Sequence, residues 1–162
     1  MRLEKALPLT RHGELLLVED TPKGRGVFAR SCIPSGTVLE TCPALVLDPV
    51  ENKLHVEKTS LYHYTYNWPL PVRDGERPQT TQAVILGLGS MFNHSSHSQN
   101  VGWERDLARE IVTYVALRDI EAGEELCISY GSRLTFVDTD ARPPTPEGDG
   151  SHILSNIQLD DP

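Results

Sequence analysis

The chain has 162 residues, a length that one folded domain accounts for. Hydrophobic residues make up 38% of it and aromatic residues 6%, which supports a modest core and excludes disorder along the whole chain. Lysine and arginine number 15 against 23 aspartates and glutamates, so the net charge is -8. This balance argues against a broad phosphate-binding surface, so we expect no direct nucleic-acid binding and basic partners instead.

The amino terminus and the cysteines narrow the class of protein further. The chain has no run of about 18 apolar residues, and its first residues lack the apolar stretch of a signal peptide. We therefore expect an intracellular, soluble protein that does not enter a membrane. Cys32, Cys42 and Cys127 are odd in number and far apart, which indicates free, mostly buried thiols rather than disulfides or a CxxC zinc pair.

Short apolar or alternating segments recur between turn signals and predict strands. In chain order they cover residues 14–18, 25–29, 37–41, 44–47, 83–88, 111–117 and 126–130. Glycine or proline supplies the chain reversals at residues 22–24, 34–36 and 121–125. Helical signal is weak and is confined to residues 52–62. The expected class is therefore mainly β, with several short sheets and little helix.

Composition changes near the carboxy terminus. Residues 138–162 contain six acids against one base, Arg142, and four of the twelve prolines. Such a segment buries too little apolar surface to offset its chain entropy. We predict a folded domain over residues 1–137 and an acidic tail, rich in proline and glycine and expected to be disordered, over residues 138–162.

The first motif that could bind a ligand is KGRGVFA, residues 23–29. Gly24 and Gly26 come directly before a predicted strand. There the missing side chains would let backbone NH groups approach a carboxylate or phosphate. An ordinary glycine turn explains the same pattern, and a dinucleotide-binding fingerprint fails because a third glycine and a following helix are missing.

The second motif is GLGSMFNHSSHSQNVGW, residues 87–103, which gathers small, polar and imidazole side chains between apolar segments. His94 and His97 fit either two surface histidines or an HxxH metal pair. Zinc needs three or four ligands, and the sequence offers no further Cys or His at suitable spacing. We therefore predict no metal.

The third motif is EAGEELCISYG, residues 121–131, in which a turn is followed by a short strand that ends at Tyr130. Taken alone, Tyr130 is typical of a half-buried tyrosine at a strand end. The aromatic segment YHYTYNW, residues 62–68, is likewise typical of core packing or an amphipathic edge.

In this order the three motifs resemble the signature elements of the SET-domain protein lysine methyltransferases: a GxG turn, an RFxNHSCxPN loop and an ELTxDY strand. The resemblance spans roughly residues 14–136, and the compact layout is similar to small fungal single-domain histone methyltransferases. It implies a β-clip of several short sheets with a carboxy-terminal pseudoknot. It also implies S-adenosylmethionine as methyl donor, S-adenosylhomocysteine as product, and a nuclear location, with the cytoplasm also open.

The resemblance implies roles for particular residues. Tyr130 falls at the methyl-transfer point. The lysine to be methylated has an unperturbed pKa of about 10.4, so a narrow apolar channel must disfavour its charged form before it can attack. Cofactor contacts fall at Lys23, Gly24, Arg25, Gly26, Asn93 and His94. Candidate channel residues are Tyr64, Tyr66, Trp68 and Ile128, of which the three aromatic ones fit core packing equally well.

Several positions depart from the family pattern. Ser96 stands where the family has a cysteine, and Asn100 comes one residue later after Asn93 than expected. Ser129 replaces the usual aspartate, and Ile128 stands where Phe or Tyr often governs how many methyl groups are added. The product state, and the lysine that is methylated, stay open.

The family's zinc-bound lid is missing from the sequence, because no cysteine follows Tyr130. Phe136 is placed to fold back over the cofactor ring, or to pack against the domain edge. Apolar surface left exposed by so small a lid favours a two-fold homodimer.

The leading hypothesis is a protein-lysine N-methyltransferase that acts on a histone tail, since an acidic surface complements a basic peptide. Methylation of a non-histone protein is one alternative. The other is a catalytically inactive SET module that serves as a binding scaffold, against which the retention of Asn93 and Tyr130 argues.

Overall fold

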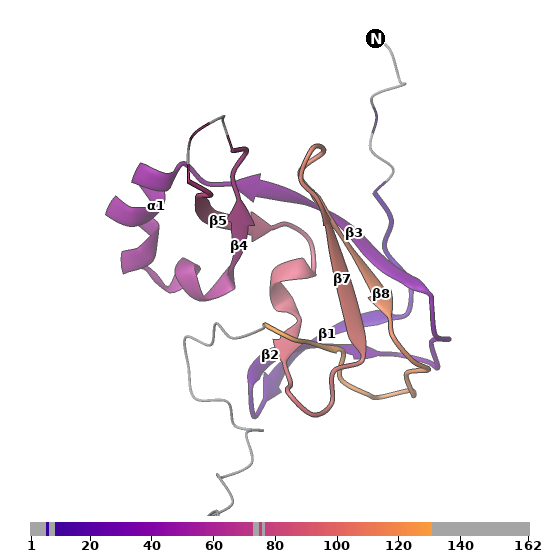
Figure 1. Ribbon diagram of the computed structural model, residues 1–162. Coiled ribbons are helices and arrows are strands. Elements are labelled where there is room, and N and C mark those ends of the chain that lie inside the picture. The colour runs from indigo at the N-terminus through magenta and orange to yellow at the C-terminus, as the bar shows by residue number, and fades with distance from the viewer. Residues whose placement is uncertain (1–5, 7–8, 73–74, 76, 131–162) are drawn as a thin grey trace, which may run out of the picture.

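The computed structural model describes residues 6, 9–72, 75 and 77–130, and within them short strands dominate (Figure 1). The predicted tail over residues 138–162 and the predicted lid residue Phe136 lie outside the described residues. The strands are β1 (Leu15–Thr21), β2 (Gly24–Ala29), β3 (Val38–Val46), β4 (Thr65–Pro69), β5 (Thr80–Ile85), β6 (Asn93–His94), β7 (Val101–Asp106), β8 (Ile111–Ala116) and β9 (Cys127–Ile128). The helical segments are α1 (Pro49–Leu54) and the 3₁₀ turns η2 (Val56–Lys58), η3 (Ser60–Tyr64) and η4 (Gly89–Met91).

The strands form three sheets. β1 and β2 pair as an antiparallel ribbon, and the largest sheet has the antiparallel order β4-β5-β3-β8-β7. The third sheet is a short parallel pair in which Asn93 of β6 lies opposite Cys127 of β9. This last pair joins the second and third sequence motifs, so the topology itself assembles the candidate site.

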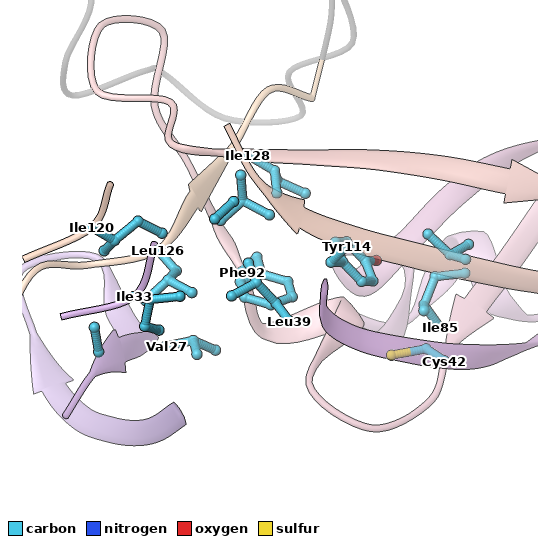
Figure 2. Close-up of a cluster of buried hydrophobic side chains, with 14 of the residues drawn as sticks. Val27, Ile33, Leu39, Cys42, Ile85, Phe92, Tyr114, Ile120, Leu126 and Ile128 are labelled. Atoms are coloured by element: carbon cyan, nitrogen blue, oxygen red, sulfur yellow. The ribbon is translucent and has the colours of Figure 1, made fainter. Parts of the chain in front are cut away.

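The core lies where the sheets meet (Figure 2). Phe92 and Tyr114 are fully buried, with their ring centroids 4.7 Å apart. Leu39 of β3, Val27 of β2 and Ile128 of β9 join them in one cluster. Burying a side chain of this size stabilises the fold by about 1.5–3 kcal/mol, so the cluster ties all three sheets together.

The strand β3 runs through two predicted strands, over residues 37–41 and 44–47. Pro43 lies between them, and a proline has no NH to donate to a neighbouring strand. It is tolerated because β3 changes partner there: Thr41 and Cys42 pair with β8, whereas Ala44 pairs with β5. The two predicted strands therefore consist of residues that are indeed extended. In the structure they form one continuous strand that pairs with β8 in its first part and with β5 in its second.

The helix α1 begins earlier than the predicted helical segment over residues 52–62. Asp48 caps it, with Oδ1 accepting from the backbone N of Val50 at 2.9 Å and of Glu51 at 3.0 Å. Pro49 follows at the first helical position, where its missing NH costs nothing. These start signals fix the beginning of the helix, and the rest of the segment forms 3₁₀ turns.

Three strands were not predicted, and one was shifted. β4 lies in the aromatic segment, β6 has only two residues, and β7 carries charged side chains that hide its alternation. The predicted strand over residues 83–88 is β5, which ends at Ile85, because the chain turns at Gly87 with a φ of 76°. The mainly β class with little helix is confirmed.

Two further expectations concern the cysteines and membranes. Cys42 and Cys127 are buried, as predicted, whereas Cys32 is exposed. No helix among the described residues is long and apolar enough to span a bilayer.

Candidate active site

The three sequence motifs meet in space although they are far apart in the chain. Phe28 of β2 forms an isolated antiparallel bridge with Glu125, just before β9. β6 pairs with β9 in parallel, which places His94 opposite Ile128. The glycine turn, the asparagine–histidine loop and the strand leading to Tyr130 therefore form one assembly.

Asn93 connects the glycine turn to the third motif. Its Nδ2 atom donates to the backbone oxygen of Arg25 at 3.0 Å and to Oε1 of Glu125 at 2.7 Å. A Cβ atom on Gly26 would lie only 2.5 Å from that carboxylate oxygen and 2.9 Å from the same Nδ2. Residue 26 must therefore be glycine for this contact to form. Sequence reasoning singled out Asn93 and Gly26 and missed Glu125.

His94 is buried and holds the backbone of Tyr130. The amide N of Tyr130 donates to Nδ1 of His94 at 3.1 Å, so Nδ1 must carry a lone pair. Nε2 of the neutral ring then carries the hydrogen and donates to Oγ of Ser96 at 3.0 Å. The backbone amide of Tyr130 thus fixes the ring tautomer, and Ser96, which replaces the family's cysteine, accepts the remaining ring hydrogen. Lys23 also contacts this loop, through a 3.3 Å hydrogen bond to the backbone oxygen of His94.

Tyr130 presents a neutral phenol to the site. Its hydroxyl donates to the backbone oxygen of Phe92 at 2.8 Å. Burial raises the pKa of Tyr130 to about 12. The side chain is therefore a hydrogen-bonding group at neutral pH and does not act as a phenolate base.

Two further tyrosine hydroxyls, those of Tyr66 and Tyr114, contact each other at the core. Tyr66 donates to the backbone oxygen of Gly89 at 2.7 Å, and Tyr114 donates to the hydroxyl of Tyr66 at 3.1 Å. Burial is the main cause that raises the pKa of both tyrosines, so both hydroxyls stay protonated. Hydroxyl and carbonyl dipoles therefore concentrate near the loop that precedes Asn93.

The four predicted channel residues lie at different depths. Tyr64 is exposed, with its hydroxyl 3.5 Å from Nη2 of Arg25. Tyr66 is half-buried and packs edge-on against another aromatic ring, Trp103, at 5.5 Å. Trp68 and Ile128 belong to the buried core cluster. Tyr64 and Tyr66 are thus the two nearest to accessible space.

A cavity of about 390 Å³ opens beside the glycine turn. Its volume falls in the range of small-molecule sites. Arg25 lines it together with Tyr64, Ser90 and Met91. Among the described residues, no group of three or more His, Cys, Asp or Glu side chains is placed to hold a metal ion.

Asn100 holds the third motif in place. It is fully buried, and its Nδ2 donates to Oε1 of Glu124 at 2.9 Å and to the backbone oxygen of Glu125 at 2.8 Å. Its Oδ1 accepts from the backbone N of Cys127 at 2.8 Å. Its extra residue of separation from Asn93 is accommodated by a turn in which Ser98 N donates to Oγ of Ser95 at 2.9 Å.

Glu40 is a second residue near the site that the motifs did not identify. It is 4% exposed and accepts hydrogen bonds from Nε and Nη2 of Arg11 at 2.8 and 2.6 Å. Its other oxygen accepts from the backbone N of Leu88 at 3.0 Å. An acidic residue inside the predicted strand over residues 37–41 was the available signal, but its partners lie far away in the sequence.

Comparison with known proteins agrees with this geometry. The family model described as the SET domain matches residues 24–131. Over 148 residues the chain is 44% identical to "Histone-lysine N-methyltransferase, H3 lysine-37 specific" of Schizosaccharomyces pombe, and the match covers 89% of this chain and 94% of that protein.

Two solved structures share the fold. One is a Plasmodium falciparum protein described as a histone methyltransferase, with a TM-score of 0.51, 21% identity, and coverage of 75% of this chain and 96% of that one. The other is CpSET8 from Cryptosporidium, with a TM-score of 0.54, 24% identity, and coverage of 75% and 59%. At these identities the likeness concerns the fold alone.

Proposed function

The chain belongs to the SET-domain family and is a protein-lysine N-methyltransferase, and we propose that its substrate is histone H3, methylated at lysine 37. One observation carries this proposal: the 44% identity extends over 94% of a relative whose name states that specificity. The net charge of -8 supports a basic histone tail as substrate, because opposite charges favour encounter.

S-adenosylmethionine is the methyl donor that we assign to the site, and it supplies a methyl group carried on a sulfonium. The residues present fit it. Arg25 lines a cavity of suitable size together with Tyr64. We assign cofactor contacts to Lys23, Gly24, Arg25, Gly26, Asn93 and His94.

The chain's own residues prepare the lysine for attack. Apolar surroundings lower the pKa of a lysine amine, which yields the neutral form that is nucleophilic. The neutral hydroxyl of Tyr130, held by the Phe92 carbonyl, then orients the amine through a hydrogen bond. Tyr64 and Tyr66 are the aromatic groups that we assign to the channel, with Ile128 and Trp68 packed behind them.

Location and assembly follow from the same proposal. A histone methyltransferase works on chromatin, so we place the protein in the nucleus. We also propose a homodimer, because Leu16, Leu17 and Val18 on strand β1 are 37–44% exposed and a second copy would cover them. Light scattering at high micromolar concentration tests this, and a strict monomer there contradicts it.

The test of the function uses labelled S-adenosylmethionine with recombinant H3, H3 in which lysine 37 is replaced by arginine, and the other core histones. We expect label on H3 alone, lost in the arginine variant, with mass spectrometry locating it. Label on another histone lysine contradicts the site. Label only on non-histone proteins would favour a non-histone methyltransferase. Cofactor binding without methyl transfer would favour an inactive SET module that serves as a binding scaffold.

A further inference from the structure

The side-chain amide of Asn93 is held from two directions. Its Nδ2 atom donates both to the backbone oxygen of Arg25 and to Oε1 of Glu125, at 3.0 and 2.7 Å. An amide nitrogen carries two hydrogens, so both are in use. Oδ1 is the polar atom that remains, and no other described residue donates a hydrogen bond to it. Asn93 therefore offers a ligand an acceptor and no donor.

Glu125 decides which way this amide faces. A side-chain amide can turn over and exchange its oxygen and nitrogen positions. In this site the turned-over form would place Oδ1 against a carboxylate oxygen and a carbonyl oxygen, and both repel another acceptor. The carboxylate is the stronger of the two acceptors, because a hydrogen bond to a charged oxygen is about twice as strong as a neutral one.

The glycine turn has made room for this pair. A Cβ atom at residue 26 would lie 2.5 Å from Oε1 of Glu125 and 2.9 Å from Nδ2 of Asn93. Real side chains do not pack that closely, so any other residue at position 26 would displace one member of the pair. The first motif thus depends on the third through the side chain of Glu125.

The charge of the pair favours a cationic donor. Glu125 adds a negative charge beside an acceptor atom, and an opposite charge at this range is attractive. The α-ammonium of S-adenosylmethionine is a cation with hydrogens to donate.

We propose that Glu125 is a positioning residue that fixes the Asn93 amide so that its Oδ1 accepts a hydrogen bond from the cofactor's α-ammonium. This inference rests on the proposed function, since it describes how one residue of that site is oriented. Glu125 acts through Asn93 and touches neither the methyl group nor the lysine. Its removal should therefore weaken cofactor binding and leave the chemical step unchanged.

The test compares Glu125→Met with Glu125→Gln, two side chains of similar length of which only glutamine keeps an acceptor oxygen. Calorimetry measures the affinity for S-adenosylhomocysteine and for its analogue lacking the α-amino group. For Glu125→Met we expect about tenfold weaker binding of S-adenosylhomocysteine, and little change for the analogue. For Glu125→Gln we expect affinities within about threefold of wild type. In activity assays the KM for the cofactor should rise while kcat stays constant.

The neighbouring glutamate supplies the control. Glu124→Gln removes a carboxylate that holds Asn100 instead of Asn93, so it should lower the melting temperature and leave both affinities unchanged. If the wild-type protein binds no S-adenosylhomocysteine, the proposed function fails. If the wild type binds it and Glu125→Met matches the wild type, or loses both ligands equally, the positioning role fails.

A measurement on the wild type covers the case in which every Glu125 variant unfolds. Nuclear magnetic resonance of the Asn93 side-chain amide should show hydrogens that exchange slowly with water before and after the cofactor product is added. Exchange as fast as that of an exposed asparagine would overturn the proposal.

Discussion

Two asparagines in the same loop are each held by one of two adjacent glutamates, yet they differ in what they leave open. Asn100 is fully buried and uses both its oxygen and its nitrogen on the chain itself. Asn93 is half-buried and uses only its nitrogen, which leaves its oxygen for a ligand. The same residue types therefore use the whole amide within the fold at one position and leave an acceptor open at the other.

The two amides differ because different groups face them. The backbone N of Cys127 donates a hydrogen bond to Oδ1 of Asn100, so this oxygen already has a partner within the chain. At Asn93 the third motif contributes the side chain of Glu125, which is an acceptor only and cannot donate to Oδ1. A fully satisfied buried amide ties a fold together, whereas the Asn93 amide keeps one acceptor atom that the chain does not use.

The largest expected effect concerns Tyr130, which is held by His94, the residue that follows Asn93. Tyr130→Phe removes the hydroxyl that donates to Phe92, in a side chain whose backbone is fixed by His94. Losing one positioned hydroxyl in a closed site costs about 100- to 1000-fold in rate. We expect that loss in kcat, with unchanged affinity for S-adenosylhomocysteine by calorimetry. A variant whose kcat stays within about threefold of wild type would remove Tyr130 from the catalytic role.

The second effect concerns cofactor binding. Asn93→Ala removes the acceptor offered to the cofactor and leaves Glu125 without its amide partner. Losing a hydrogen bond to a charged group, together with this rearrangement, should weaken binding about 100-fold, which abolishes it in ordinary titrations. The melting temperature should change little because the side chain is half-buried. Unchanged affinity for S-adenosylhomocysteine would contradict the proposal that Asn93 binds the cofactor.

The third effect should fall on stability. Asn100→Ala removes the acceptor that the backbone N of Cys127 uses and the donor that reaches the buried backbone oxygen of Glu125. Unpartnered buried polar groups cost about 1–3 kcal/mol each, so we expect the free energy of unfolding to fall by about 2–4 kcal/mol. Urea denaturation measures this change. Cofactor affinity, measured at a temperature where the variant is folded, should stay within about threefold of wild type, and a selective loss of affinity would contradict the structural role.

The sequence located the two asparagines of this comparison better than the two glutamates that hold them. Asn93, His94 and Tyr130 stand in local motifs, so position alone indicated them. Glu125 was present in the quoted motif, but its role depends on a contact with residue 93 and on the space left by Gly26. No local pattern encodes a contact across that distance in the chain.

The fold shows the same division between local and distant signals. The strands around Val27 and Tyr114 were predictable because their apolar alternation is local. The capping pair Asp48 and Pro49 was also local and, with hindsight, marked the helix start. The exchange of partners at Pro43 and the two-residue strand β6 depend on tertiary pairing, which overrides weak local preference.

The smallest expected effect is a pH dependence of the free energy of unfolding that comes from Glu124, the residue that holds Asn100. The hydrogen bond from Arg118 is the main cause that lowers the pKa of Glu124 to about 2, from an ordinary value of 4.5. Because the folded pKa lies below the unfolded one, Glu124 stabilises the fold above pH 4.5, and this contribution is lost as the pH falls from about 4.5 towards 2.

The measurement compares the free energy of unfolding of wild type and Glu124→Gln at neutral pH and at successively lower pH. The Glu124 side chain is 26% exposed, so solvent screens its ion pair with Arg118 and the ion pair contributes about 0.5–1 kcal/mol at neutral pH. The pH-dependent part of the difference between the two proteins should therefore be of that size and should shrink on acidification. Arg118→Met should reduce the same pH dependence, because it removes the partner that holds the carboxylate ionised. A difference that stays constant down to acid pH would show that Glu124 contributes through its hydrogen bond to Asn100 and not through its charge.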